Sequence, residues 1–232
     1  MRILARVLAF VGLSLASAAL VTLTASANAS TCGLDPLPHC YAYAATIPPT
    51  IDGIASYIDP DCLSVPSNNA ITDEVWLADA STNWVEGGYV YNNGLSLGGL
   101  TTNGVLGFWA DQRPGAGGYH AWALVNNPPL TNRIVSVRQT SSSTFIVNFD
   151  GHFGYSTGNT QVPFVGIIGS ETTDPTTTAH SYGFFGSMMY RSAGPFGGWS
   201  SSLYNPSSPP GTGPEHLTWN VVGKSAFAGA YC

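Results

Sequence analysis

The sequence predicts an all-β domain, either a sandwich or a barrel, built from short strands. Three observations lead to this prediction. After residue 29 the apolar residues almost never recur with the helical period of 3.6. Short segments rich in valine, isoleucine, threonine and aromatic residues recur instead, and clusters of glycine, asparagine and proline separate them. This alternation is typical of strands joined by turns.

Nine segments have the composition of strands. In chain order they are Val75–Asp79, Trp84–Tyr91, Val105–Asp111, Tyr119–Val125, Arg133–Gln139, Thr144–Phe149, Val162–Ile168, Tyr182–Tyr190 and His216–Val222. Residues 126–129 and 141–143 carry the asparagine, proline and serine signals of turns. Residues 200–214 contain four prolines and no apolar period, which predicts a long surface loop.

Residues 1–29 predict a secretory signal peptide. Two arginines near the start precede an apolar run at 7–23, and the small residues at 25–29 fit a cleavage site. No later apolar stretch is long enough to cross a bilayer. We therefore expect an extracellular, secreted protein in which residues 30–232 form a single β-sandwich domain.

The mature chain is expected to be acidic and to carry few charges. Removal of the two leader arginines leaves five basic residues (7 − 2) against thirteen acidic ones, a formal charge of −8. This balance argues against nucleic acids and anionic membranes as partners, because both require a basic surface. Only 9% of the residues are charged, so neutral polar groups must cover much of the surface. We expect a monomer that needs no cofactor.

Four cysteines remain after the leader, Cys32, Cys40, Cys62 and Cys232. An even number of cysteines in an oxidising compartment predicts two disulfides. Three pairings are possible, and we favour Cys40–Cys62 with Cys32–Cys232 because a sandwich often brings its terminal strands together. No pair of cysteines has the spacing of a metal site, and the five histidines are scattered, so a zinc site is unsupported.

Two of the four glutamates, Glu86 and Glu171, lie in apolar or glycine-rich strand contexts where a surface carboxylate is unexpected. In the segment 84–91, strand alternation places Trp84, Glu86 and Gly88 on one face. A neighbouring glycine removes side-chain bulk and lets a ligand approach, so Glu86 is expected to line a groove. The alternative is an edge-strand glutamate that faces water.

Glu171 repeats this pattern. It follows two isoleucines, a glycine and a serine, so an apolar strand again delivers a glutamate beside small residues. The alternative is a strand-end residue in a loop. Two such glutamates in a chain with so few charges favour a functional pair, because burying a charge is costly unless it has a partner or a role.

A second cluster comprises Trp109, Asp111, Arg113, Tyr119 and His120. Asp111 and Arg113 are two residues apart, so they share a strand face and are expected to form an ion pair. One interpretation makes this pair a turn-stabilising salt bridge among core aromatic residues. The other makes Trp109 and Tyr119 walls of a substrate groove.

Residues 94–98 match the Gly-x-Ser-x-Gly string of serine hydrolases. The mechanism of that motif needs a strand before the serine and a helix after it, and the flanking sequence predicts neither. We therefore expect a glycine-rich loop here.

The order of these segments resembles that of the secreted glutamic peptidases, both the eqolisins and the neprosin-like proteins. The resemblance covers roughly residues 76–171. It rests on Trp76, the strand 84–91, the aromatic strand 107–111 and the segment 169–171.

The resemblance implies that Glu86 and Glu171 form a catalytic dyad. In the eqolisins a catalytic glutamine occupies the place of Glu86 and a catalytic glutamate that of Glu171, and the 85-residue separation (171 − 86) is similar. The neprosin-like proteins use two glutamates, one in a Gly-Gly-Glu context that the segment 169–171 resembles. The chain departs from the eqolisins in its glutamate at position 86 and in lacking a further glutamate in the aromatic strand.

The resemblance further implies a two-sheet antiparallel β-sandwich of the concanavalin A-like, jelly-roll type, and a hydrolase that cleaves polypeptides at acidic pH. Glu171 is expected to be the general base, and protonated Glu86 to stabilise the oxyanion. The residues expected to line the substrate groove are Trp76, Trp84, Trp109, Asp111 and Tyr119. Two alternatives on the same fold are a non-catalytic, lectin-like module that binds a glycan and a glycoside hydrolase that uses the same carboxylates.

Overall fold

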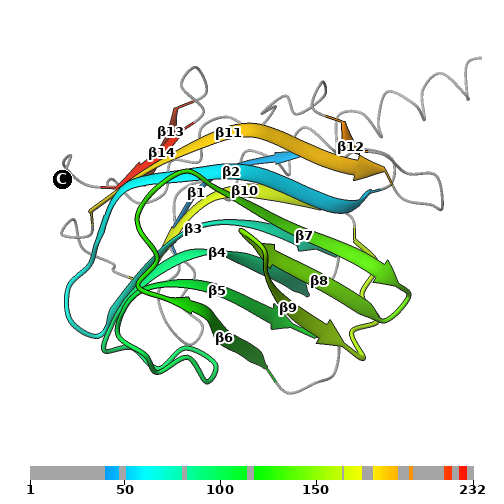
Figure 1. Ribbon diagram of the computed structural model, residues 1–232, viewed down its shortest axis with the longest axis horizontal. Coiled ribbons are helices and arrows are strands. Elements are labelled where there is room, and N and C mark those ends of the chain that lie inside the picture. Colours follow the sequence, from blue (N-terminus) through cyan, green and yellow to red (C-terminus); the bar gives the residue numbers. More distant parts are fainter. Residues whose placement is uncertain are drawn as a thin grey trace, which may run out of the picture.

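The computed structural model describes two antiparallel sheets packed face to face (Figure 1). The described residues are 40–46, 51–79, 83–113, 118–163, 165–173, 180–192, 199–200, 217–220 and 225–228. All regular secondary structure within these ranges is β-strand. The predicted signal peptide and nearly all of the predicted loop at 200–214 lie outside the described residues.

The six-stranded sheet has the order β1-β10-β3-β4-β5-β6. Its strands are β1 (Cys40–Thr46), β3 (Asn69–Ala78), β4 (Trp84–Asn93), β5 (Gly104–Gln112), β6 (Tyr119–Asn126) and β10 (Val165–Thr172). All five neighbouring pairs are antiparallel. Strands β3, β4 and β5 follow one another along the chain and across the sheet, whereas β10 returns from far along the chain to pair with β3.

The second sheet has the order β13-β14-β11-β2-β7-β8-β9, with the short β12 paired to β11. Its strands are β2 (Ile51–Ser64), β7 (Arg133–Ser141), β8 (Thr144–Phe149), β9 (His152–Thr157), β11 (His180–Ser192), β12 (Trp199–Ser200), β13 (Leu217–Asn220) and β14 (Ser225–Ala228). All of its pairs are also antiparallel.

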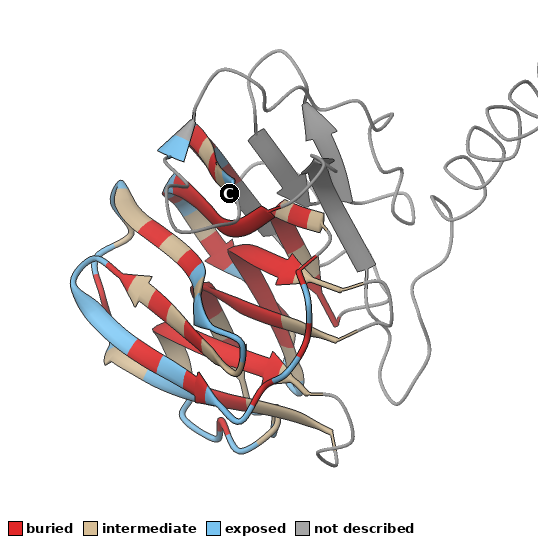
Figure 2. Ribbon diagram, turned by 90° about the vertical axis from the view of Figure 1, so that its right-hand side faces the viewer, coloured by how far each residue is buried: buried red, intermediate tan, exposed pale blue. Residues whose placement is uncertain are grey.

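A hydrophobic core fills the space between the sheets. It contains, among others, Ile54, Ile58, Ile71, Val75, Leu77, Val85, Tyr89, Val137, Phe145, Val147, Ile168 and Phe185. Along β8 and β9 buried residues alternate with more exposed ones, as expected of strands with one face on the core and one in solvent. Figure 2 shows this alternation as bands of colour along the ribbon.

The six-stranded sheet is different because β3, β4 and β5 are buried on both faces. We call the face that points away from the eight-stranded sheet the outer face. Part of it packs against Leu95, Leu97 and Leu100, which form a second apolar cluster with residues of β4, β5 and β6. The segment 94–98 lies between the end of β4 and the start of β5 and is a loop, as predicted. Of the carboxylates on the outer face, Glu74 and Glu86 are removed from water.

The predicted strands agree with the structure best where composition is least ambiguous. Thr144–Phe149 is a strand with the predicted bounds, whereas β1, β2, β9, β12 and β14 were not predicted. Strand β2 contains three aspartates and the buried Pro60, a residue that argues against a central strand, and its register with β11 shifts near that proline. Strand β9 is short and follows a tight turn at Asp150 and Gly151, which have φ angles of 48° and 90°.

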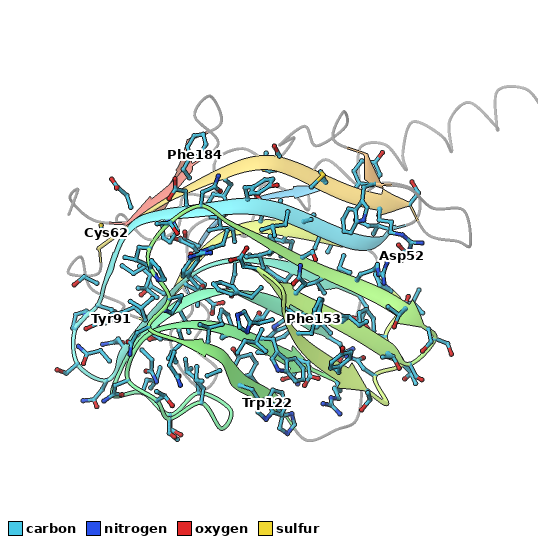
Figure 3. The ribbon with its side chains drawn as sticks, in the orientation of Figure 1. Asp52, Cys62, Tyr91, Trp122, Phe153 and Phe184 are labelled. Carbon is cyan, nitrogen blue, oxygen red and sulfur yellow. The ribbon has the colours of Figure 1, made fainter. Side chains whose placement is uncertain are left out.

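Cys62, near the end of β2, is disulfide-bonded (labelled in Figure 3). The side chain of its partner lies outside the described residues, so the pairing of the four cysteines stays a prediction. The part of the chain that the structure describes contains no helix able to span a membrane.

Candidate active site

Glu86 and Glu171 lie on the same face of the six-stranded sheet. In β4, Glu86 is opposite Trp76 of β3 and Ala110 of β5, and Glu171 of β10 is opposite Thr72 of β3. Residues directly opposite each other in a ladder share a face. The core residues of β3 and β4 occupy the alternate positions, so this shared face is the outer one, and the predicted alternation in the segment 84–91 is confirmed.

A third glutamate, Glu74 of β3, lies between them. Its register neighbours are two glycines, Gly88 on β4 and Gly169 on β10. Glu86 is two residues from the first glycine and Glu171 two residues from the second, so both glutamates are diagonal neighbours of Glu74. The three side chains thus converge from three adjacent strands.

Gly88 is required for this arrangement. A Cβ atom added at Gly88 would lie 2.2 Å from the carbonyl oxygen of Asp73 and 2.6 Å from Cα of Glu74. These are backbone atoms, which cannot move aside as a flexible side chain can. The glycine therefore allows β3 and β4 to approach closely beside the glutamates.

The three carboxylates form a compact, largely buried cluster. One carboxylate oxygen from each of Glu74, Glu86 and Glu171 lies within 4.8 Å of the others. The side chain of Glu74 is fully buried and Glu86 is 3% exposed, whereas Glu171 is only partly buried. Glu171 is therefore the member of the cluster that solvent reaches most readily.

The hydrogen bonds of the cluster distinguish its members. The hydroxyl of Tyr119, on β6, donates to Oε1 of Glu86 over 2.8 Å. The ring of Tyr119 lies 6.2 Å from that of Trp84, centroid to centroid. Neither oxygen of Glu74 has a hydrogen-bond partner. Glu74 is therefore a buried carboxyl whose ionised form is not stabilised by any hydrogen bond of normal geometry.

The electrostatics follow from burial and from this crowding of like charges. Desolvation raises the pKa of the Glu74 carboxyl well above its usual value, and the negative charges of Glu86 and Glu171 raise it further. The Thr72 hydroxyl acts in the opposite direction. Desolvation, followed by the Glu86 charge, also raises the pKa of Tyr119 well above its usual value. Tyr119 thus remains a hydrogen-bond donor, and Glu74 favours its neutral form.

The structure brings some of the predicted groove residues to the cluster and places others elsewhere. Trp76, Trp84 and Tyr119 share the outer face with Glu86, since Trp76 is opposite Glu86, Trp84 is two residues before it, and Tyr119 is opposite Gln112 of the same face.

Trp109 and Asp111 occupy the alternate positions of β5 and face the other way. Trp109 belongs to the core between the sheets, where it packs against Gly154 and its ring stacks on Trp122 with centroids 4.2 Å apart. Trp122 is 40% exposed at the edge strand β6 (Figure 3). Asp111 is buried and accepts a hydrogen bond of 2.7 Å from Nε of Arg113, so the predicted ion pair is confirmed. Contrary to expectation, neither residue lies beside the glutamates, because strand alternation gives Ala110 that position.

Sequence reasoning missed Glu74. The predicted strand began at Val75, so its alternation was not extended to Glu74. The strand in fact starts at Asn69. Extending the alternation backward from Trp76 by two residues would have placed Glu74 on the face of Glu86.

The same three carboxylates are spaced closely enough to contact one cation. A calcium ion, however, takes six to eight oxygen ligands, and the described groups around the glutamates are mainly two tryptophans, a tyrosine and glycines. Protonation lowers the negative charge of such a cluster without further ligands. We therefore interpret the cluster as a proton-sharing group of carboxyls.

Comparison with known proteins supports this architecture. No protein-family model and no curated protein matches the chain. Among solved structures, scytalido-glutamic peptidase with a transition state analog inhibitor superposes with a TM-score of 0.55 at 12% identity, covering 84% of this chain and 100% of that one. The chain shares the fold of scytalido-glutamic peptidase. The same peptidase with a peptide based transition state analog gives a TM-score of 0.54 at 11% identity, with the same coverage.

A third match is SCP-B, a member of the eqolisin family in complex with the tripeptide Ala-Ile-His, with a TM-score of 0.49 at 13% identity and the same coverage of both chains. At these identities the likeness to scytalido-glutamic peptidase establishes the fold. The predicted two-sheet sandwich, and the resemblance to the glutamic peptidases at the level of the fold, are confirmed.

Proposed function

We propose that this chain is a secreted, acid-acting glutamic endopeptidase that hydrolyses peptide bonds with Glu86, Glu171 and an activated water molecule. The observation that carries the proposal is the convergence of these carboxyls within 4.8 Å on one face of a sandwich. Scytalido-glutamic peptidase, which shares this fold, binds a peptide based transition state analog. The proposal extends that activity to this chain.

Glu171 is assigned the role of general base. It is the carboxyl of the cluster that is only partly buried, so a water molecule reaches it without displacing packed side chains. In its ionised form it accepts a proton from this water as the oxygen attacks the carbonyl carbon of the scissile peptide. The backbone N–H of Glu171 donates to the Thr72 hydroxyl over 3.2 Å, which holds the residue in the strand.

Glu86 is assigned the role of hydrogen-bond donor to the developing oxyanion. Its Oε1 atom accepts a hydrogen bond from Tyr119, so we assign the proton of its neutral form to Oε2. A neutral carboxyl at this position donates to the carbonyl oxygen of the substrate, as an amide side chain would. Two carboxyls this close disfavour double ionisation, which helps one of them to keep a proton.

The substrate is assigned to the outer face, where Trp76, Trp84 and Tyr119 lie near the carboxyls. These aromatic side chains offer apolar contacts to a polypeptide backbone and its side chains. The assignment leaves out Trp109 and Asp111, which face the core.

The proposed mechanism works at acidic pH because the Glu86–Glu171 pair must carry one proton. Activity should fall at high pH as the pair loses this proton, and at low pH as it gains a second one, which gives a bell-shaped profile. The predicted signal peptide, two disulfides and sparsely charged surface suit a monomer that works outside the cell in an acidic medium.

The alternative function, a glycoside hydrolase, would use the same carboxyls. A retaining glycosidase holds its two carboxyls about 5–5.5 Å apart, which is near the spacing of this cluster. Substrate class, rather than carboxyl spacing, must therefore separate the two activities.

The test is to incubate the purified mature protein, from about pH 2 to pH 7, with denatured proteins and with a panel of polysaccharides. We expect cleavage of the proteins in acid, loss of cleavage in Glu171→Gln, and full cleavage in Asp61→Asn, which removes an exposed carboxylate of β2. Cleavage of a polysaccharide, or glycan binding without proteolysis, would instead support one of the carbohydrate alternatives.

A further inference from the structure

Glu74 is the one member of the carboxyl cluster to which the proposed mechanism assigns no step. Its side chain is fully buried, and neither of its oxygens accepts a hydrogen bond. An ionised carboxylate in such a place lacks solvent. The Thr72 hydroxyl, which favours the charge, has less effect than desolvation and the two neighbouring glutamates, so the charge is disfavoured.

Among the described residues, negative groups surround Glu74 and no cation is paired with it. Glu86 faces it from β4 and Glu171 from β10, each with an oxygen within 4.8 Å. Tyr119 approaches from β6, and Asp73 precedes it on β3 but points to the opposite face. The described arginines that form ion pairs bind Asp52, Asp111 and Asp150 instead.

Protonation of Glu74 removes the charge that would otherwise be buried without solvent and surrounded by negative groups. A neutral carboxyl has an O–H group to donate, and Glu86 and Glu171 each offer an acceptor oxygen within 4.8 Å. Gly88 and Gly169, the register neighbours of Glu74, have no side chains that would stand between it and these two glutamates. The site is therefore shaped for three carboxyls that share protons.

We infer that Glu74 is a positioning residue that stays protonated throughout the acidic working range and donates its hydrogen bond to the ionised carboxylate of the Glu86–Glu171 pair. This inference rests on the proposed function. Glu74 thereby orients the pair and adds no third charge to it. Burial of Glu74, which raises its pKa, supports the same assignment.

Two substitutions test whether Glu74 acts as a hydrogen-bond donor or only fills space between the other two glutamates. Glu74→Gln keeps the shape and a donor but cannot ionise, whereas Glu74→Leu keeps similar bulk and removes the donor. We expect Glu74→Leu to lose about a hundredfold in kcat with little change in KM, because the pair is no longer held in place. Glu74→Gln should lose less than about tenfold, since it replaces a single hydrogen bond by a similar one, and its pH profile should keep the bell shape of the wild type.

The measurements use the full mature protein in the presence of EDTA, so that no bound cation neutralises the cluster. Circular dichroism checks that each variant is folded. Inactivation of Glu74→Gln as complete as that of Glu171→Gln would overturn the inference, since it would show that Glu74 acts in its ionised form. Equal activity of Glu74→Leu and the wild type would overturn it as well, since Glu74 would then position nothing.

A spectroscopic readout keeps this test separate from the peptidase proposal. At pH 6, where an ordinary glutamate is ionised, the infrared spectrum of the wild type should contain the carbonyl band of a protonated carboxylic acid. The band should lose intensity in Glu74→Gln and persist in Glu86→Gln, which removes the other carboxyl to which the mechanism gives a proton. This band supports the protonated state even if the protein cleaves no peptide. Its absence from the wild type would contradict that state even if the protein is an active peptidase.

Discussion

Glu86 and Glu171 are chemically identical side chains, and only their surroundings separate their roles. Glu86 is almost fully buried and accepts a hydrogen bond from Tyr119, whereas Glu171 is partly accessible. The same substitution at the two positions should therefore have different effects.

Glu171→Gln should lose roughly two to four orders of magnitude in rate, as expected when a general base is removed. Glu86→Gln should retain part of its activity, because the amide is a permanent donor. The loss of activity at high pH should also move upward in this variant, since the donor no longer depends on a proton. The measurement is kcat/KM for a peptide substrate as a function of pH. Equal and complete inactivation of both variants, with folding intact, would contradict these roles.

The residue scale also shows what the sequence alone could and could not predict. The segment 84–91 was assigned its outward face correctly because its alternation is unbroken. Trp109 was expected in the groove because it is aromatic and close in sequence to other candidates. The face on which its side chain lies depends on the register of β5 with β4, which a single sequence does not provide. Glu74 was missed because the predicted strand began at Val75, whereas β3 begins at Asn69.

At the scale of the strand, the site depends on how closely β3 and β4 approach. Gly88→Ala should destabilise the fold by about 1–3 kcal/mol, because the added methyl group would overlap the backbone of Asp73 and Glu74. The substitution should also reduce activity, since any relief of the overlap moves Glu74 away from Glu86. Urea denaturation and peptide cleavage measure the two effects.

Gly186→Ala on β11 is the matched control. An added Cβ there meets only ordinary contacts, 3.7 Å to Cβ of Tyr57 and 3.9 Å to the ring of Phe184. This variant should keep its activity and change the free energy of unfolding much less. If Gly88→Ala were as stable and active as Gly186→Ala, the close approach of β3 and β4 would not be what positions the glutamates.

At this scale the sequence predicted the central strands well and the less regular ones poorly. Strands β4 to β8 have dense β-branched and aromatic residues between clear turns, so composition alone located them. Strand β2 was hidden by Pro60 and its aspartates, because the long pairing with β11 that tolerates them is set by tertiary contacts. The resemblance to a known family implied the two-sheet sandwich, but the order of the strands in the sheets was not predicted.

For the whole molecule, burial of Glu74 makes stability depend on pH. The pKa of Glu74 in the folded protein is raised above its value in the unfolded chain. Its contribution to the free energy of unfolding is therefore fully present below the unfolded pKa and is lost as the pH rises through the folded pKa. Between these two values the loss amounts to at most about 1.4 kcal/mol per pH unit for one group.

Glu74→Gln removes this dependence. The free energy of unfolding of the variant, relative to the wild type, should therefore increase from about pH 4.5, the ordinary glutamate value, toward neutral pH. Urea denaturation at several pH values measures it, with Asp61→Asn as a control at an exposed carboxylate. A difference that stays constant with pH would show that Glu74 has the same pKa in the folded and unfolded chain.

The central claim is that two carboxyls of unequal role act together on a peptide bond. The most direct test is the pH dependence of kcat/KM for cleavage of one peptide substrate by the wild-type protein. We predict a bell-shaped profile with its maximum in the acidic range, because one carboxyl must be ionised and the other protonated. A profile with a single limb, a maximum at neutral pH or no cleavage at any pH would contradict the account.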